Sequence, residues 1–226
     1  WPHLVKGMVR KGLLKELGPD FDIRTHFTPR YNPWDQRMCL VPDADLFQVL
    51  REGRADIVTD HIETFTPAGI RLKSGKELAA DIIVTATGLN LQALGGAQLA
   101  VDGQPVNLAQ TMSYKGMMLS GVPNMALALG YTNASWTLKV DLTCDYVCRL
   151  LNHMRARGYR QCTPRRDASV AEVPFIDFSS GYILRSIDKF PRQGSVAPWK
   201  LHQNYAMDIL ALRYGKVDEP SLQYAE

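Results

Sequence analysis

The sequence lacks the glycine-rich turns with which many nucleotide-binding folds hold phosphates. Neither G-x-G-x-x-G nor G-x-x-x-x-G-K-[ST] occurs in its 226 residues, so the primary phosphate turn of a dinucleotide-binding or P-loop fold is not in this chain. The G-x-S-x-G elbow and the H-E-x-x-H zinc motif do not occur either. Function therefore has to be inferred from longer segments rather than from one short motif.

Metal-ligating residues are few and scattered. The five histidines lie far apart, and no pair has the spacing of a metal site. Cys144 and Cys148 are four residues apart in a predicted helix, which places both thiols on one face. Two further ligands at suitable spacing are missing, so we predict no metal site and reduced thiols. A reducing, cytoplasmic setting fits that cysteine usage.

Long runs of apolar residues and long runs of basic residues are also missing. Apolar stretches are interrupted well short of a membrane-spanning length. Lysine and arginine are spread along a chain of net charge +3, so nucleic acid is not an expected partner. The start resembles a basic amphipathic helix rather than a secretory signal, and it has no initiator methionine. We expect the chain to begin inside a longer protein, with a missing amino-terminal half.

Helix-capping and turn-forming residues predict the first secondary-structure elements. A helix over residues 1–17 ends at Gly18, and a shorter helix begins with Asp43 as N-cap and has Gly53 just after its end. Between residues 55 and 88, turns at residues 67–69 and 74–75 separate a series of short strands. The strands within residues 61–78 are predicted to form a hairpin or meander.

Two apolar segments end in glycine and are predicted to be buried strands. The segment "DIIVTATG" (81–88) is apolar on both faces at Ile82, Ile83 and Val84, as in a central strand covered on both sides. The second segment runs from Met125 to Leu129 and stops at Gly130. In doubly wound α/β folds, ligands bind beyond the carboxyl ends of such strands.

Two helices are predicted in the second half. The first starts at Ser135 or Thr137 and ends near Arg157, before Gly158. Its buried stripe is expected at helical spacing, while Lys139 is interpreted as a solvated or salt-bridged residue. The residues of that expected stripe are Val140, Val147, Leu151 and Met154. The last helix is predicted from about Pro198 to Tyr214.

Three segments together resemble the flavin-containing monooxygenases, and more closely the Baeyer–Villiger type and its ethionamide-activating branch. They are "FTPRYNPWDQRMCLVPDADLF" (27–47), "GIRLKSGKELAADIIVTATGLN" (69–90) and "PNMALALGYTNASWTLKVDLTCDYVCRLLNHM" (123–154). The resemblance covers nearly the whole chain in the same order. It implies an α/β fold, as part of a flavoprotein with two Rossmann-like dinucleotide-binding domains whose glycine-rich turns lie upstream of Trp1.

The resemblance implies how the chain is divided and which cofactors it serves. Residues 1–86 are expected to be the carboxyl-terminal part of the NADPH-binding domain. Residues 87–226 are expected to be the carboxyl-terminal part of the FAD-binding domain, with a helical extension. The implied activity is an NADPH- and FAD-dependent monooxygenase that uses O₂ to oxidise a small ketone, sulfide or amine.

The resemblance also implies roles for individual residues. Arg37 would lie over the flavin and nicotinamide, where its guanidinium holds a flavin C4a-peroxide anion and then the developing oxyanion. The strand end at Thr85, Ala86, Thr87 and Gly88 would approach both cofactors through its backbone. The helix start would face the pyrimidine edge of the flavin, with these residues in contact: Gly130, Tyr131, Asn133, Ser135, Trp136 and Thr137.

Plainer interpretations remain open for these residues. Arg37 can brace its loop, Gly88 can serve a tight turn that needs a positive φ, and Trp136 can belong to an ordinary capped helix. The chain can also be a truncated remnant or an interaction protein without catalysis, as the missing glycine-rich turns suggest. A flavoprotein reductase acting on a dithiol or quinone ranks lower, because Cys144 and Cys148 lie in mid-helix.

Overall fold

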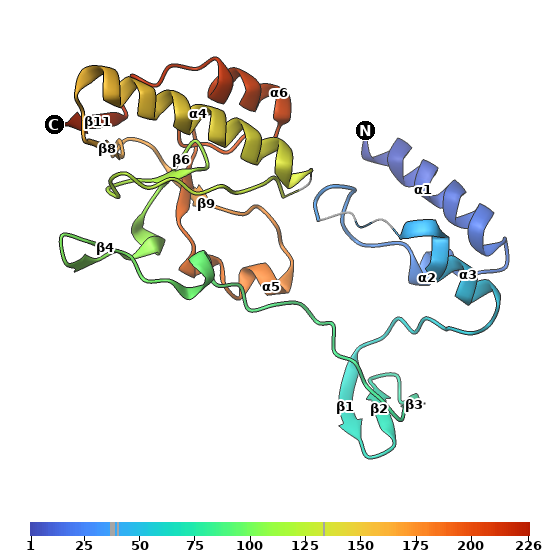
Figure 1. The fold of residues 1–226 in the computed structure, drawn as a ribbon. Helices are drawn as coiled ribbons and strands as arrows, with labels where there is room; N and C mark the ends of the chain where they lie inside the picture. Colours follow the sequence, from blue (N-terminus) through green and yellow to red (C-terminus); the bar gives the residue numbers. More distant parts are fainter. Residues whose placement is uncertain (37–38, 40, 133) are drawn as a thin grey trace. The chain divides into compact units, whose positions relative to one another are not determined.

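The chain divides into two units, residues Trp1–Thr87 and Gly88–Glu226. The structure is a computed structural model, and it describes residues 1–36, 39, 41–132 and 134–226 (Figure 1). The division lies one residue from the boundary expected from the sequence. The assignment of the two halves to NADPH- and FAD-binding domains stays a prediction.

The first unit opens with helices. Helix α1 ends at Gly18, which has a φ of 85° as expected for a glycine at a helix terminus. Helix α3 is followed by Gly53 with a φ of 67°, but Ala44 and not Asp43 precedes it, because Asp43 lies inside a preceding 3₁₀ turn. The helical elements are α1 (Pro2–Leu17), α2 (Ile23–His26), η1 (Pro42–Ala44) and α3 (Asp45–Arg51).

The same unit ends in a small antiparallel sheet in the order β1-β2-β3. The strands are β1 (Ile62–Thr66), β2 (Gly69–Leu72) and β3 (Glu77–Ala79), and the predicted turns at 67–69 and 74–75 join them. The meander prediction is confirmed. Residues 55–60, also predicted to be a strand, have no strand assignment.

The second unit consists of two-stranded antiparallel sheets around one long helix, α4. Its strands pair β4 with β5, β6 with β7, β8 with β11, and β9 with β10. Their bounds are β4 (Ala100–Val101), β5 (Gln104–Pro105), β6 (Ser113–Tyr114), β7 (Met118–Leu119), β8 (Gln161–Pro164), β9 (Glu172–Pro174), β10 (Arg192–Gly194) and β11 (Leu222–Ala225). The helical elements are η2 (Ala93–Gly96), η3 (Leu108–Gln110), α4 (Trp136–Arg157), α5 (Gly181–Leu184), η4 (Ile187–Lys189), α6 (Tyr205–Asp208) and the π-helical turn η5 (Ile209–Arg213).

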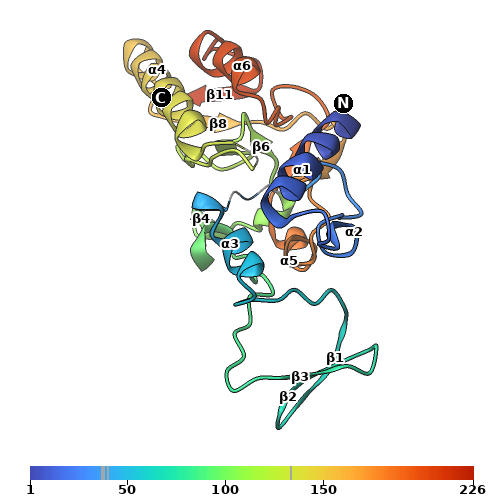
Figure 2. The ribbon, with the colours of Figure 1, turned by 90° about the vertical axis from the view of Figure 1, so that its right-hand side faces the viewer.

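The core of the second unit lies beneath α4. Helix α6 runs beside α4 (Figures 1 and 2). Burial of large apolar side chains is the main contribution to the stability of this unit. The cluster comprises Met112, Tyr114, Met117, Met118, Leu142, Tyr146, Leu150, Met154, Cys162, Val170, Trp199, Leu212 and Leu222.

Helix α4 begins after Ser135 and ends at Gly158, which has a φ of 72°, as the sequence predicted. The predicted buried stripe is wrong in part. Met154 is buried, whereas Leu151 is 56% exposed. The buried face carries Lys139 and Tyr146, two polar residues that find partners in the core, which hydrophobicity alone does not reveal. Its members are Lys139, Leu142, Thr143, Tyr146, Leu150 and Met154.

Three further predictions of secondary structure are wrong. Residues 81–88 and 125–129 have no strand assignment, and Ile82 and Val84 are 83% and 84% exposed. A central strand needs a hydrogen-bonding neighbour on each side, and neither segment pairs with a strand in the described part of the chain. The last helix starts at Tyr205 rather than Pro198, because Asn204 provides the N-cap by accepting a hydrogen bond from the Met207 amide at 3.1 Å.

The fold is thus a mixture of helices and strands. All the strand pairs among the described residues are antiparallel. These pairs therefore do not form a doubly wound parallel sheet, and the Rossmann-like architecture remains a proposal.

Candidate functional site

The loop that leads into α4 is shaped by a glycine against a tryptophan. A Cβ atom placed on Gly130 would lie 2.1 Å from Cγ of Trp136, so no larger residue fits without moving the ring. Trp136 is nevertheless 52% exposed, because only part of its indole covers the Gly130 backbone. It is therefore not a core residue of the described chain, and the loop presents an aromatic surface beside the start of the helix.

The amino-terminal end of α4 has backbone donors available. Ser135 is the N-cap residue, but its hydroxyl lies 2.8 Å from Oγ1 of Thr137 and makes no capping hydrogen bond to the backbone. The first N–H groups of any α-helix lack intrahelical partners, and the peptide dipoles concentrate positive charge there. A 22-residue helix with this start offers hydrogen-bond donors to an electron-rich group.

Tyr131 is hydrogen-bonded to a buried carboxylate. Its hydroxyl donates to Oδ2 of Asp208 at 2.7 Å, and Nζ of Lys139 lies 2.9 Å from the same oxygen. All three residues are buried. Burial, and then the Asp208 carboxylate, raises the pKa of Tyr131. Burial lowers the pKa of Lys139, and Asp208 opposes that shift.

Thr132 has its own partner in the same carboxyl-terminal segment. Oε1 of Gln203 accepts from the Thr132 amide at 3.1 Å and from the Thr132 hydroxyl at 3.2 Å. Sequence reasoning missed Gln203 and Asp208, because both lie more than 70 residues from the loop and in or beside a predicted helix that starts in the wrong place. The interpretation of Lys139 as salt-bridged is confirmed, whereas a solvated position is not.

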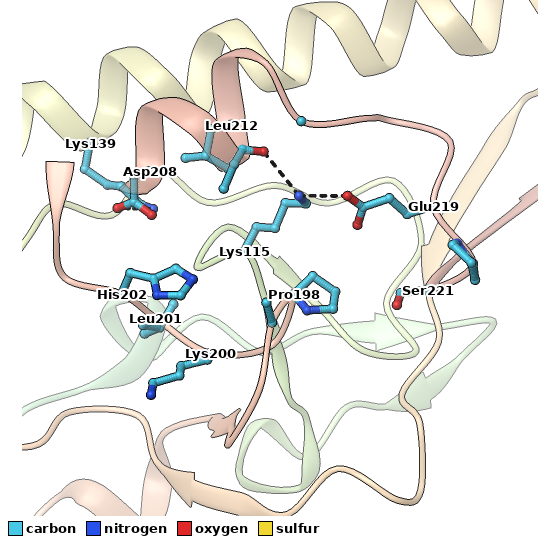
Figure 3. Close-up of a pocket in the computed structure, with 14 residues that line it drawn as sticks. Lys115, Lys139, Pro198, Lys200, Leu201, His202, Asp208, Leu212, Glu219 and Ser221 are labelled. Carbon is cyan, nitrogen blue, oxygen red and sulfur yellow. Dashed lines mark hydrogen bonds and ion pairs between the residues drawn. The ribbon is translucent and has the colours of Figure 1, made fainter. Parts of the chain in front are cut away.

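A pocket of about 440 Å³ lies next to this carboxylate (Figure 3). Two of its lysines pair with carboxylates that also line the pocket. Lys139 pairs with Asp208, and Lys115 pairs with Glu219 at 3.0 Å. The lining residues are Lys115, Lys139, Ala197, Pro198, Lys200, Leu201, His202, Asp208, Ala211, Leu212, Gly215, Glu219, Pro220 and Ser221.

A second tyrosine, carboxylate and lysine group repeats the chemistry of the first. The Tyr114 hydroxyl donates to Glu219 at 2.7 Å and lies 3.1 Å from the Tyr146 hydroxyl. Lys115 completes this group, and its ammonium also donates to the carbonyl of Ala211 at 3.2 Å. Burial is the first cause that raises the pKa of Tyr114. This group lies in the core and makes no hydrogen bond to residues 130–137 among the described contacts.

The other predicted cofactor contacts lie at the boundary of the units. Thr85, Ala86 and Thr87 are exposed residues at the end of the first unit, and Gly88 begins the second. Gly88 has a φ of 103°, and a Cβ atom there would lie 2.8 Å from Cβ of Tyr182 in α5. The positive φ predicted for this glycine is confirmed, while its contact with a cofactor stays a prediction.

Two of the predicted site residues, Arg37 and Asn133, lie outside the described residues. The structure brings the remaining loop residues together, since Gly130, Tyr131, Ser135, Trp136 and Thr137 share one turn of chain and the start of one helix.

Two other features are absent from the described part of the chain. It contains no cluster of three or more histidine, cysteine, aspartate or glutamate residues arranged to hold a metal ion. In the same part, no helix combines the length and apolar character needed to cross a membrane. Cys39, Cys144 and Cys148 are free and exposed, and Cys162 is free and buried.

Comparison with known proteins gives matches over the full length of the chain. It is 55% identical over 227 residues to the FAD-containing monooxygenase EthA of Mycobacterium tuberculosis, an alignment that covers 100% of this chain and 46% of that protein. It is 50% identical over 226 residues to the probable FAD-binding monooxygenase AlmA of an Acinetobacter species, covering 99% of this chain and 45% of that protein. The chain therefore spans about half the length of these curated relatives. No family model matches it.

A solved structure shares the fold. The crystal structure of OTEMO in an FAD-bound form matches with a TM-score of 0.65 and 15% sequence identity, over 99% of this chain and 45% of that one. The match supports the fold alone. The chain is thus similar over its whole length to proteins named as FAD-containing or FAD-binding monooxygenases, and it matches their carboxyl-terminal portion.

Proposed function

We propose that this chain is the carboxyl-terminal part of an FAD- and NADPH-dependent monooxygenase that uses O₂ to oxidise a small ketone, sulfide or amine. The observation that carries the proposal is identity of 50% or more, over essentially the whole chain, to proteins named as flavin monooxygenases. The loop at Gly130–Thr137 supports it, because that loop combines an aromatic surface with a helix start whose donors can meet an electron-rich group.

The residues of this loop fit a flavin. The amino-terminal end of α4 would face the pyrimidine edge of the ring, where negative charge collects on reduction, and would stabilise that charge by about 1 kcal/mol. Gly130 would allow the Trp136 indole to stay against the backbone while leaving its other side for contact. Bound flavin would supply the activation of O₂ with electrons from NADPH. The chain's own part is to bind and orient the ring.

Arg37 would be the catalytic cation, as the resemblance in residues 27–47 implies. A guanidinium stays charged at any working pH and offers a fork of donors, so it can hold an oxygen atom that gains negative charge. Thr85–Gly88 and Asn133 complete the proposed cofactor contacts. The assignments of Arg37, Thr85–Gly88 and Asn133 rest on sequence resemblance. Local geometry also supports the assignments of Gly130, Tyr131, Ser135, Trp136 and Thr137.

The main alternative is a non-catalytic chain, either a truncated remnant or an interaction protein. It draws on the missing glycine-rich turns and on Ile82 and Val84, which are exposed and lie outside any strand pair of the described residues. The identity to EthA and AlmA favours the enzyme for the longer protein, because both relatives are named as flavin monooxygenases.

The test is flavin retention by the 226-residue chain. Purified chain would be incubated with FAD, desalted and examined for a visible flavin absorption band. We expect the band to be retained, to be lost in Gly130→Ala, and to be kept in the control Gly7→Ala, whose added Cβ meets nothing within 4 Å. Circular dichroism of each variant reports whether the fold is intact.

The alternatives predict different spectra. Flavin retained by the chain and lost in Gly130→Ala supports a cofactor loop, and NADPH oxidation would then be assayed. A colourless, folded wild-type chain contradicts cofactor binding by this part and favours the non-catalytic alternative. Equal retention in both glycine variants would place the flavin elsewhere.

A further inference from the structure

We propose that Gln203 and Asp208 are positioning residues for the flavin loop: they fix residues 131 and 132 from the carboxyl-terminal segment without touching the cofactor. The inference rests on the proposed function only for its predicted effect on FAD binding. The hydrogen bonds that support it do not involve a flavin. The inference assigns a role to a segment that follows the loop by more than 70 residues.

Two consecutive loop residues are held by two separate contacts. Asp208 accepts from the Tyr131 hydroxyl at 2.7 Å, and Gln203 accepts from both the amide and the hydroxyl of Thr132. On the other side of the loop, Trp136 lies against Gly130. Residues 130–132 are thus held by contacts with Trp136 and with the carboxyl-terminal segment, which limits the conformations available to them.

The spacing of the two anchors is set by one short helix. Asn204 caps α6, and the Asp208 amide donates to the Asn204 carbonyl at 3.0 Å. Gln203 precedes this capped turn and Asp208 ends it, so the turn holds their separation constant. The packing of the following turn, η5, against α4 keeps the whole segment in place, with Leu212 buried in the core.

Lys139 explains how Asp208 stays in this position. A lysine near the amino-terminal end of a helix is unfavourable for the helix itself, because the dipole is positive there. Lys139 is the fourth residue of α4, yet it is buried and paired with Asp208 (Figure 3). The helix dipole therefore does not account for a lysine at this position. The ion pair offsets the cost of a buried carboxylate whose other contact is Tyr131.

The test measures loop order directly. Amide hydrogen exchange would be followed in wild type, Tyr131→Phe, Gln203→Ala and Gln203→Glu. We expect exchange of the peptide over residues 130–135 to become about two- to tenfold faster in Tyr131→Phe and Gln203→Ala, as expected for one lost hydrogen bond. Gln203→Glu keeps an acceptor oxygen for Thr132 and should restore the wild-type rate.

Tyr114→Phe is the matched control. It also removes a buried tyrosine hydroxyl from a carboxylate beside a lysine, but its partner Glu219 makes no described contact with the loop. We expect it to leave exchange over residues 130–135 unchanged. Gln203 is exposed, so Gln203→Ala keeps the proposal testable if Tyr131→Phe does not fold.

The outcomes separate the two proposals. Loop exchange that stays at the wild-type rate in Gln203→Ala, or that rises equally in Tyr114→Phe, overturns the positioning role. FAD affinity is then measured by titration on the same variants and should weaken by a factor similar to that of the exchange. A loosened loop with unchanged FAD affinity overturns the flavin assignment and leaves the positioning of the loop established.

Discussion

Lys139 and Asp208 form an ion pair of 2.9 Å with only 9% and 6% of their side chains exposed. An isolated charge at such a depth is costly, so each residue depends on the other. The pair joins the first turn of α4 to the end of α6, and Tyr131 adds the candidate cofactor loop to the same carboxylate.

Asp208→Asn is expected to destabilise the chain by about 3–5 kcal/mol, because it leaves the Lys139 ammonium buried without its counter-ion. The free energy of unfolding in urea measures the effect. The double variant Asp208→Asn with Lys139→Met removes both charges and should recover most of the loss. A single variant that costs less than about 1 kcal/mol would contradict the coupling, since that is the range of an exposed pair.

Cys162 is expected to show delayed reactivity and a pH-dependent contribution to stability. Burial raises the pKa of its thiol to about 11, from an ordinary value of 9.0. The folded state then favours the protonated thiol, so this contribution is complete below pH 9 and declines as the pH rises from 9 through 11. The difference in unfolding free energy between wild type and Cys162→Ala, measured across this range, should shrink as the pH increases.

A thiol reagent provides an independent check on Cys162. At pH 8, Cys39, Cys144 and Cys148 are expected to react in the native chain, because all three are exposed. Cys162 should react only after denaturant is added. Four thiols reacting at one rate in the native chain would contradict its burial.

Ile82 and Val84 are expected to be dispensable for this chain and required for its assembly with further sequence. Replacing both by lysine should change the free energy of unfolding by less than about 0.5 kcal/mol, because both side chains are exposed. Leu72→Lys, at a buried position, is the destabilising control. If residues 81–88 become a central strand in the longer enzyme, the double lysine variant should prevent reconstitution of flavin binding with an amino-terminal half supplied from a relative. Equal reconstitution would contradict that strand.

Arg37→Ala is expected to uncouple the two half-reactions in such a reconstituted enzyme. NADPH should still reduce the flavin, while oxidation of the ketone or sulfide should be lost. Stopped-flow reduction and product analysis separate the two steps. Arg30→Ala, at an exposed position of the same segment, is the control. Product formed at the wild-type rate by Arg37→Ala would refute the catalytic role.

Local signals predicted the local structure well. Gly18, Gly53 and Gly158 marked the ends of three helices, and the turn residues of the β1–β2–β3 meander marked its strands. Capping and turn preferences depend on a few neighbouring residues, so a single sequence contains enough information to apply them.

Predictions that depended on distant partners did less well. The segments 81–88 and 125–129 have the composition of central strands, but composition does not supply a neighbouring strand. The buried stripe of α4 was misplaced because Lys139 and Tyr146 are polar and yet buried, with partners in later segments. The loop at 130–137 was recognised as one continuous segment, whereas Gln203 and Asp208 could only be found in three dimensions.

The separation in sequence between the loop and its anchors has a consequence for protein synthesis. Tyr131 leaves the ribosome 77 residues before Asp208, and Thr132 leaves it 71 residues before Gln203. During that interval the loop has its sequence but not its anchors. A nascent chain that stops before residue 203 therefore contains Tyr131 and Thr132 without these partners, and the hydrogen bonds to them form only after α6 has been synthesised.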